Sequence, residues 1–468
     1  IIIGKKSFFG TKIKSFNATK ASTIGDEAFY NCSELSSFNL GGNNTLDAIG
    51  TGAFTNCVKL ESIVLPGTVK SIGAGAFKNT GLKTFSFTNE KLIIEYGMLE
   101  GCQSIEELDL AYLPGGYVGY IFGCNDMENL SLSIPKSLKE ITISGAMEAL
   151  SSHAFAGCTG LKTVNLPNGI KVIGDHAFYD CKSLVDVNLG DSIEAIGEYA
   201  FAYTSIGAIT IPESMAVISE GTFKGCTSLA SVTTHEGLLE VSKDAFFGCE
   251  SLTSIDLYNT IIIGDNAFAE SGLIKIEIPT DILTLGEAIL ADCNSIEEIT
   301  VPLYDVSYIE EYFSSLYEYS PIPDTLTKIN INKAVGIQSG AFAGCYSVEE
   351  IVLCEGIITV GSAFDSCHEL RKLILPKTLE SFEPSSTYYC TKLYEICNQS
   401  ETVEILAGVG AGQNSLYVST SIEGCAPTVV IDGYTFSKYN DSWYFTNWEN
   451  EIIELSLPNE FTYSYISS

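Results

Sequence analysis

Two histidines are spaced in a way that could hold a metal ion. His153 and His176 stand 23 residues apart, and each comes directly before an Ala-Phe pair. If the chain coils with that period, their side chains lie about 5 Å apart, and imidazole is a common zinc ligand. Elsewhere the same place holds Glu27, Tyr199 or Asp244, which is typical of a surface position. Because no third or fourth ligand accompanies the pair, we predict no metal site.

Acidic and amide side chains at a similar spacing could belong to an enzyme that cleaves polysaccharides. Right-handed parallel β-helices that act on polysaccharides coil with a comparable period, and some carry rows of Asp and Asn side chains. Asp186, Asn188 and Asp256 are the candidates for such a row and its catalytic carboxylates. Such a helix needs three strand segments per coil, whereas this sequence alternates one strand with a turn. The sequence also lacks a nucleophile elbow, a phosphate loop, a calcium loop and a Cys-x-x-Cys pair. We therefore predict no catalytic residues and no cofactor.

An internal repeat supplies the elements that position these residues. From Phe155 to Leu290, where Leu replaces Phe, the aromatic position recurs every 22 or 23 residues, and this period indicates a stacked solenoid. Segments such as 60–65 alternate in their last half and predict one strand per repeat with one face buried. A Pro ends the strand. An Ile-Gly pair then leads into a short helical or 3₁₀ turn that buries the Phe.

Cysteine is the other recurrent residue. Twelve of the 15 cysteines lie three residues after the Phe position or close to it, and Thr80, Thr204 or Ser271 takes this place in other repeats. A position that accepts Cys, Thr or Ser requires a small side chain that donates weakly to a turn carbonyl. Stacked Cβ atoms about 4.8 Å apart are too distant for a disulfide, so we predict free, buried thiols. Three cysteines lie outside this pattern: Cys354, Cys397 and Cys425.

The whole repeat reads A-F-x-x-C-x-x-L-x-x-[IV]-x-[LI]-P followed by I-G, as in 52–66, 153–167 and 362–376. Recurring over roughly residues 1 to 397, it resembles the BspA-like leucine-rich-repeat surface proteins of bacteria and some protists. The resemblance implies a right-handed leucine-rich-repeat solenoid of the β-rich α/β superhelix class, with about 16 repeats of 22–25 residues. A parallel sheet would form its concave face, and short 3₁₀ or helical turns and loops its convex face. It also implies adhesion to host proteins, matrix proteins or other cells.

Composition restricts the partners and the location. The net charge is −33, which repels nucleic acid and anionic lipid and favours cationic partners. The sequence has no run of about 18 apolar residues, so we predict no direct membrane insertion. The chain begins at Ile1 in the middle of a repeat. We therefore expect a signal peptide and an anchor to lie outside it, and we predict a secreted or cell-surface protein.

Two Tyr-rich segments interrupt the period, 111–122 and 303–320, and they open elongated repeats near 111–155 and 303–342. Tyr on loops offers amphipathic contact area at low entropic cost, as binding surfaces do. The alternative is that these rings cover a widened core. The candidate partner-binding residues here are Tyr112, Tyr117, Tyr120, Tyr304, Tyr308 and Tyr312.

The outward positions of the predicted strands form a second candidate surface. They flank the central β-branched residue and are short, polar and often acidic. Leucine-rich-repeat proteins commonly bind ligands with this face, and the alternative is a solvated face without a ligand. The candidates are Glu107, Asp109, Asp186, Asn188, Asp256, Glu298 and Glu350.

The repeat is lost near the C-terminus. We predict a solenoid over 1–397 and a β-rich capping or accessory module over 398–468, with a return to the repeat at 452–458. Trp443 and Trp448 would be buried in a cap, or they would stack on sugars. Two functions remain open: an adhesin that binds a protein ligand, and a carbohydrate- or cell-wall-associated protein whose glycan recognition lies in this module.

Overall fold

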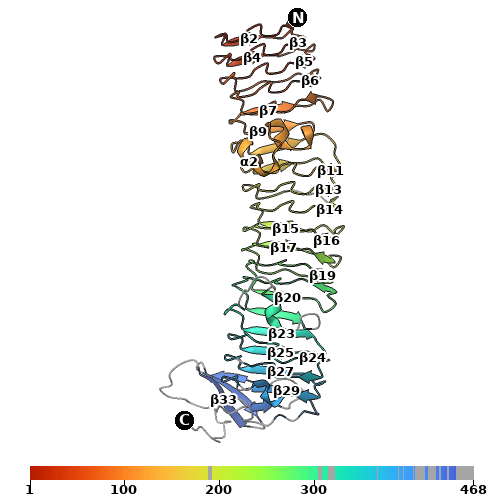
Figure 1. Cartoon of the computed structure of the whole chain (residues 1–468), viewed down its shortest axis with the longest axis vertical. Helices are drawn as coiled ribbons and strands as arrows, with labels where there is room; N and C mark the ends of the chain where they lie inside the picture. The colour runs from red at the N-terminus through yellow and green to blue at the C-terminus, as the bar shows by residue number, and fades with distance from the viewer. Residues whose placement is uncertain are drawn as a thin grey trace. The chain divides into compact units, whose positions relative to one another are not determined.

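The chain divides into two compact units, Ile1–Gly272 and Leu273–Ser468. Each unit consists of coils stacked on one another, with one coil per repeat (Figure 1). None of the helices in the described part of the chain is long and apolar enough to cross a bilayer. The computed structural model describes residues 1–187, 192–303, 308–314, 322–365, 367–387, 389–393, 395–403 and 405, and the backbone of strands at 417–419, 428–431, 434–439 and 442–448.

In most coils one strand is the alternating segment predicted from the sequence, and we call this row the long-strand ladder. The segments 60–65 and 252–257 have the predicted alternation but form no strand. Its strands pair in parallel as β2-β4, β7-β9-β10-β12 and β15-β17 in the first unit, and as β20-β22-β23-β25-β27-β29-β30 in the second. Apolar side chains point inward and polar ones outward, as the exposed–buried–exposed–buried order of β9 shows. The bounds are β2 Ser15–Asn17, β4 Ser37–Asn39, β7 Thr84–Phe87, β9 Glu107–Leu110, β10 Glu140–Ile143, β12 Thr163–Asn165, β15 Ala208–Thr210, β17 Ser231–Thr233, β20 Lys275–Glu277, β22 Glu298–Pro302, β23 Lys328–Lys333, β25 Glu350–Leu353, β27 Lys372–Leu375, β29 Glu395–Asn398 and β30 Tyr417–Ser419.

A second row of two-residue strands ends at the Ile of the Ile-Gly pair, as in Ala48–Ile49, or at the equivalent residue where the Gly is replaced, as in Ile93–Ile94 before Glu95. We call it the short-strand ladder. The prediction of one strand per repeat is therefore wrong. Ile49, for example, pairs in parallel with Ile24 on one side and with Ile72 on the other. The bounds are β1 Ile2–Ile3, β3 Thr23–Ile24, β5 Ala48–Ile49, β6 Ser71–Ile72, β8 Ile93–Ile94, β11 Ala149–Leu150, β13 Val172–Ile173, β14 Ala195–Ile196, β16 Val217–Ile218, β18 Glu240–Val241, β19 Ile262–Ile263, β21 Thr284–Leu285, β24 Gly336–Ile337, β26 Thr359–Val360 and β28 Ser381–Phe382.

The segment that carries each Phe, which we call the turn side, is a series of hydrogen-bonded turns instead of a short helix. In the coil at 25–32, Glu27 and Asn31 have φ values of 52° and 58°, and left-handed residues cannot continue a right-handed helix. Gly, Asn or Asp fills many of these places because these residues tolerate positive φ. The turns also bond to the next coil: the Phe29 N–H donates to the Ala53 carbonyl at 2.8 Å.

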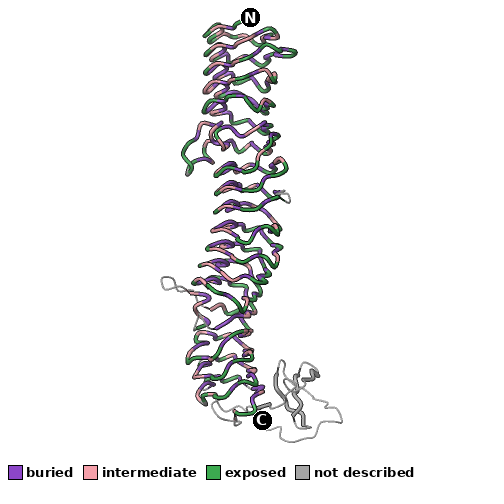
Figure 2. Tube along the Cα trace, turned by 90° about the vertical axis from the view of Figure 1, so that its right-hand side faces the viewer, coloured by how far each residue is buried: buried purple, intermediate pink, exposed green. Residues whose placement is uncertain are grey.

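The Phe side chains of successive coils stack on one another inside the coils. Phe29 and Phe54 lie with ring centroids 5.3 Å apart and planes within 4°, and Phe77 follows Phe54 at the same distance. In the second unit Phe342 and Phe364 stack in the same way at 5.0 Å. Buried residues therefore recur at the same places in successive coils (Figure 2).

The Cys positions confirm the prediction of free, buried thiols. The Cys57 thiol donates to the carbonyl of Phe29 in the preceding coil at 3.1 Å, and Thr80 instead donates to Phe77 of its own coil at 2.9 Å. Burial, together with the neighbouring Cys32, raises the pKa of Cys57 to about 12. Outside this column Cys354 is free, whereas Cys397 is disulfide-bonded.

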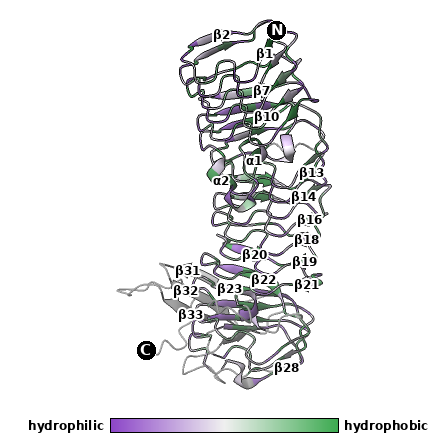
Figure 3. Ribbon diagram, turned by 45° about the horizontal axis from the view of Figure 1, so that its top comes forward, coloured by the Kyte–Doolittle hydropathy of each residue, from purple (hydrophilic) through white to green (hydrophobic). Residues whose placement is uncertain are grey.

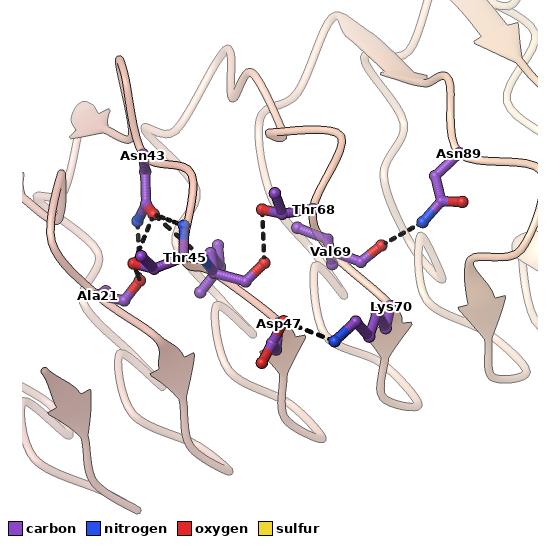
Figure 4. A network of polar contacts seen from close by, with 9 residues as sticks. Ala21, Asn43, Thr45, Asp47, Thr68, Val69, Lys70 and Asn89 are labelled. Carbon is purple, nitrogen blue, oxygen red and sulfur yellow. Dashed lines mark hydrogen bonds and ion pairs between the residues drawn. The ribbon is translucent and has the colours of Figure 1, made fainter.

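A further column of polar side chains joins the coils where the chain enters the short-strand ladder (Figure 4). The buried Asn43 amide donates to the Ala21 carbonyl at 2.9 Å, and its oxygen accepts the Thr45 N–H. In the following coils Thr68 donates to Leu46, and Asn89 donates to Val69. These bonds satisfy carbonyls that face no strand partner.

Most of the described helices occur where the repeat is interrupted, whereas η4 lies on the turn side of the coil that follows β28. In the first unit an inserted coil carries α1 and α2 beside the coils of β10 and β13 (Figure 3), and Phe122 of that coil is buried like the repeat Phe residues. In the second unit η3 belongs to a similar inserted coil with a buried Phe313. The bounds are η1 Pro114–Gly116, α1 Val118–Ile121, η2 Met127–Asn129, α2 Leu130–Ser133, η3 Ile309–Tyr312 and η4 Pro384–Thr387.

The parallel pattern changes near the C-terminus of the second unit. All four residues of β29 are buried, so both faces of this strand are covered. Beyond β30 lies a three-stranded antiparallel sheet of β31 (Thr428–Ile431), β32 (Tyr434–Tyr439) and β33 (Ser442–Trp448). The predicted return to the repeat at 452–458 lies outside the described residues. The predicted division at 397 stays a prediction, although the long-strand ladder continues to β30.

Candidate binding surfaces

The outward side of the long-strand ladder in the first unit is exposed and acidic. Glu107 of β9 lies directly opposite Glu140 of β10, and Asp109 lies opposite Thr142. Glu107 and Asp109 are both exposed. Like charges in directly opposite positions repel each other, so this face carries negative charge that its strand neighbours do not neutralise. It could attract a cationic partner.

Two further predicted aspartates lie in the same row of coils without belonging to strands. Asp186 and Asp256 are both exposed. Asn188 lies outside the described residues. Asp186 and Asp256 are presented from separate coils.

In the second unit the outward positions alternate in charge from strand to strand. Lys328 of β23 lies between Glu298 and Glu350, with its Nζ 3.3 and 3.6 Å from their Oε1 atoms. The side-chain amide of Asn330 donates to Glu298 and, with Lys328, lowers the pKa of that carboxyl. Burial works against the charge of Lys328, but Glu350 and Glu298 outweigh it and raise the pKa of the ammonium. Glu298 and Glu350 are thus occupied by contacts between coils.

The tyrosines of the first inserted coil pack partly against the solenoid. The Tyr112 hydroxyl donates to the Leu92 carbonyl. Tyr120 makes an edge-to-face contact with Tyr117 at 6.2 Å, and its ring lies over Gly115, where a Cβ would come within 2.4 Å of it. These half-buried rings both cover the coil and leave edges exposed. Burial raises the pKa of Tyr112 and Tyr117.

The tyrosines of the second inserted coil differ from one another. Tyr312 is only 1% exposed, and its hydroxyl donates to the Pro302 carbonyl at 2.5 Å. It fills a widened core, which is the alternative that the sequence left open. Tyr308 is exposed, whereas Tyr304 lies outside the described residues. Trp443 and Trp448 belong to β33, and their side chains likewise lie outside the described part of the chain.

A hollow of about 350 Å³ lies beside the first inserted coil, and we call it the His–Tyr hollow. His153 and His176, which the sequence placed in contact, stack with parallel rings and centroids 4.9 Å apart. Burial lowers the pKa of both imidazoles, and His176 lowers that of His153 further. No group of three or more metal-ligating side chains occurs in the described residues. The hollow is lined by Met127, Leu130, Ser131, His153, Ala156, Gly157, His176, Tyr179 and Asp180.

A second hollow of about 530 Å³ lies further along the coils, and four of its ten lining residues are carboxylates. Glu220 accepts a hydrogen bond from the Tyr199 hydroxyl at 2.7 Å. Burial first, and then this bond, raises the pKa of Tyr199. Asp175 accepts the backbone N–H of Glu198 at 3.0 Å. Both carboxylates therefore support neighbouring coils.

Sequence reasoning found the histidine pair but missed Met127, Leu130, Tyr179 and Asp180. The two apolar residues belong to an insertion that has no counterpart in the repeat, so no spacing predicts where it folds. Asp180 stands at a left-handed turn position with a φ of 61°. In many other coils that position holds Gly or Asn, and in two it holds the carboxylates Glu270 and Asp292. The carboxylate directly after Tyr179 was the available signal.

Comparison with curated proteins finds no match. Among solved structures, the chain is similar to a leucine-rich repeat protein from Bacteroides ovatus, with 25% identity over 76% of each chain and a TM-score of 0.43. It is also similar to a leucine-rich cell surface protein from Faecalibacterium prausnitzii, with 22% identity over 56% of this chain and 73% of that one, at a TM-score of 0.29. The chain is also similar to the pneumococcal vaccine antigen PcpA, with 15% identity over 68% of this chain and 85% of that one, at a TM-score of 0.38.

A family model covers most of the chain. The BspA-type leucine-rich repeat region, in six copies, matches residues 1–112, 133–241, 217–331 and 317–442. The unmatched residues 113–132 belong to the first inserted coil, where the structure departs from the repeat. Parallel ladders, stacked Phe rings and buried Cys residues account physically for the repeated motif. This chain belongs to the BspA-type leucine-rich-repeat family.

Proposed function

We propose that this chain is a non-catalytic binding scaffold that is secreted or displayed on a cell surface, where it acts as an adhesin for a host, matrix or cell-surface protein. The observation that carries the proposal is the open, exposed face of the long-strand ladder. Its residues Glu107, Asp109 and Glu140 present unneutralised negative charge. A rigid row of side chains at a spacing of about 4.8 Å offers a partner a wide surface without any enclosed chemistry.

Membership in the BspA-type family supports the surface location, because the proteins that this repeat resembles are surface proteins. The charge supports a partner with a basic surface, since complementary charge steers association and discriminates against acidic proteins. Affinity should therefore fall as the salt concentration rises.

A binding screen of the purified chain tests this function. Matrix proteins and a glycan array are assayed at physiological salt, with and without calcium. For a protein ligand found there, the charge reversals Asp109→Lys and Asp256→Lys should weaken binding by about tenfold or more. Glu250→Lys, an exposed residue outside the long-strand ladder, is the matched control and should leave binding unchanged.

One result would transfer the function to the C-terminal module. Glycan binding that survives both reversals but is lost with Trp443→Ala, or with deletion of 398–468, would favour a carbohydrate- or cell-wall-associated protein. Protein binding that is indifferent to the reversals and to salt would contradict recognition by the long-strand face.

A further inference from the structure

The His–Tyr hollow has a wall that is fixed in place. Leu130 and Ser131 of α2 pack directly on Gly157 of the coil below, where a Cβ would lie 2.8 Å from the Leu130 Cβ and 2.7 Å from the Ser131 N. Any side chain at residue 157 would push α2 away. Because Gly157 has no side chain, the insertion can pack closely against the solenoid. A hollow of about 350 Å³ lies between them.

Aromatic rings make up the opposite side. His176 is stacked between His153 at 4.9 Å and Tyr199 at 5.2 Å, and it also contacts the ring of Tyr179 at 5.4 Å. Its Nδ1 is buried and has no hydrogen-bond partner among the described residues. Because burial lowers the pKa of both imidazoles, the rings are uncharged at neutral pH and present π-electron density.

One charged side chain completes the site. Among the described lining residues, only Asp180 carries a charge at neutral pH. Its Oδ1 lies 3.0 Å from the Nζ of Lys182, but this lysine is 65% exposed. An exposed ion pair of this kind contributes little and is screened by salt. A ligand cation that fits the hollow better can therefore replace the lysine.

We propose that the His–Tyr hollow binds the guanidinium group of an arginine side chain from a partner polypeptide. A guanidinium is planar and cationic, so it stacks on aromatic faces and donates two parallel hydrogen bonds to a carboxylate such as Asp180. The apolar stem of arginine can lie along Met127 and Leu130. A lysine ammonium has the charge but lacks the plane and the fork of donors.

This inference rests on the proposed function in one respect, that the arginine belongs to a protein partner. The site is nevertheless distinct, because it lies between α2 and the turn side and uses no residue of the long-strand ladder. The amide-capped amino acid Nα-acetylarginine methylamide serves as the probe, and so no partner has to be known. Its citrulline counterpart has nearly the same shape without the charge, and the lysine counterpart has the charge without the plane.

Histidine NMR of the full, untagged chain reports on the site. The sequence has four histidines, so the ring C–H signals are few, and His153→Asn and His176→Asn assign the two that matter. The arginine probe should shift the signals of His153 and His176 with a dissociation constant on the order of 1 mM, as expected for a ligand of this size. The citrulline and lysine probes should bind at least several-fold more weakly.

Two variants with a matched control complete the test. Asp180→Asn should weaken the arginine probe roughly tenfold, and it should fold normally because Asn31 and Asn56 occupy the same left-handed position. Tyr179→Ala removes one of the aromatic rings and should weaken binding of the arginine probe as well. This variant should fold normally, since Ala202 stands in the equivalent place of the next coil. Asp292→Asn changes the same turn position in the second unit, with a φ of 54°, and should have no effect.

Several outcomes would overturn the inference. These are equal shifts with the citrulline probe, unchanged binding in Asp180→Asn, or shifts at His235 and His368 instead of the stacked pair. The two proposals fail separately. If a protein ligand is sensitive to Asp109→Lys but the arginine probe does not bind, only the proposal for the His–Tyr hollow is refuted. If the arginine probe binds but the chain recognises no protein, only the proposal of an adhesin is refuted.

Discussion

The imidazole rings of His153 and His176 lie parallel, with an interplanar angle of 0° and centroids 4.9 Å apart, although the residues are 23 positions apart in the sequence. The stack follows from the coil period, which places equivalent residues at the spacing of adjacent parallel layers. Burial lowers the pKa of both rings, and each also interacts with the nearby carboxylate of Asp175, which partly opposes the shift.

The lowered pKa values predict a loss of stability in mild acid. Unfolded imidazoles, with an ordinary pKa of about 6.5, take up protons before the folded ones do. The stability from these rings is therefore complete above about pH 6.5 and is lost as the pH falls through the depressed folded pKa. Urea unfolding midpoints between pH 7.5 and 5.5 should fall in the natural chain and fall less in the double variant His153→Asn/His176→Asn. If the urea midpoints of the two proteins fell equally with pH, the loss of stability could not be assigned to His153 and His176.

The thiol of Cys57 and the carbonyl of Phe29 predict which substitutions the Cys column tolerates. Cys57→Ser keeps a donor of similar size and should stay close to the natural stability. Cys57→Ala removes the bond to a buried carbonyl and should cost about 1 kcal/mol, while Cys57→Leu overpacks the site and should cost about 1–3 kcal/mol. Urea midpoints measure the order. If Ala were the best tolerated of the three, packing and not hydrogen bonding would explain the column.

The position of Lys328 between Glu298 and Glu350 predicts a destabilised second unit when its charge is removed. Lys328→Met keeps the apolar stem but leaves two acidic side chains without the cation between them. Because the groups are partly exposed, the expected loss is about 0.5–1 kcal/mol, and it should shrink at high salt. Lys70→Met, which breaks a more exposed pair with Asp47, is the control and should change the midpoint less. A salt-independent loss would point to packing instead.

Much of the architecture could be predicted because each coil repeats the same physical solution. The Phe stack and the Cys column follow from spacing and from the residue types that share a position. The short-strand ladder was missed, since a two-residue strand such as Ala48–Ile49 is too short to show alternation. The wall of the His–Tyr hollow was also missed, because Leu130 belongs to an insertion without a repeat partner. For Tyr312 the sequence left open a binding surface and a widened core, because Tyr suits both places.

Two glycines of one coil predict responses to substitution that differ in size. Gly73 ends the Ile-Gly pair, and a Cβ there would lie 2.5 Å from the Thr51 backbone N of the preceding coil. Gly75 has a φ of 59°, but a Cβ there would meet nothing closer than the Lys78 Cβ at 3.7 Å. The first glycine is therefore required for close stacking of the backbones, and the second only for its left-handed conformation.

Gly73→Ala should separate two coils and break the bond between the Gly73 N–H and the Ile49 carbonyl, at a cost of about 3 kcal/mol or more. Gly75→Asn should cost less than about 1 kcal/mol, because Asn tolerates positive φ and Asn266 occupies the same place in another coil. Hydrogen exchange at the Gly73 amide, together with urea midpoints, separates the two effects. If both variants were equally stable, neighbouring coils could move apart at little cost in free energy. Gly73 would then be required only for the conformation of the turn.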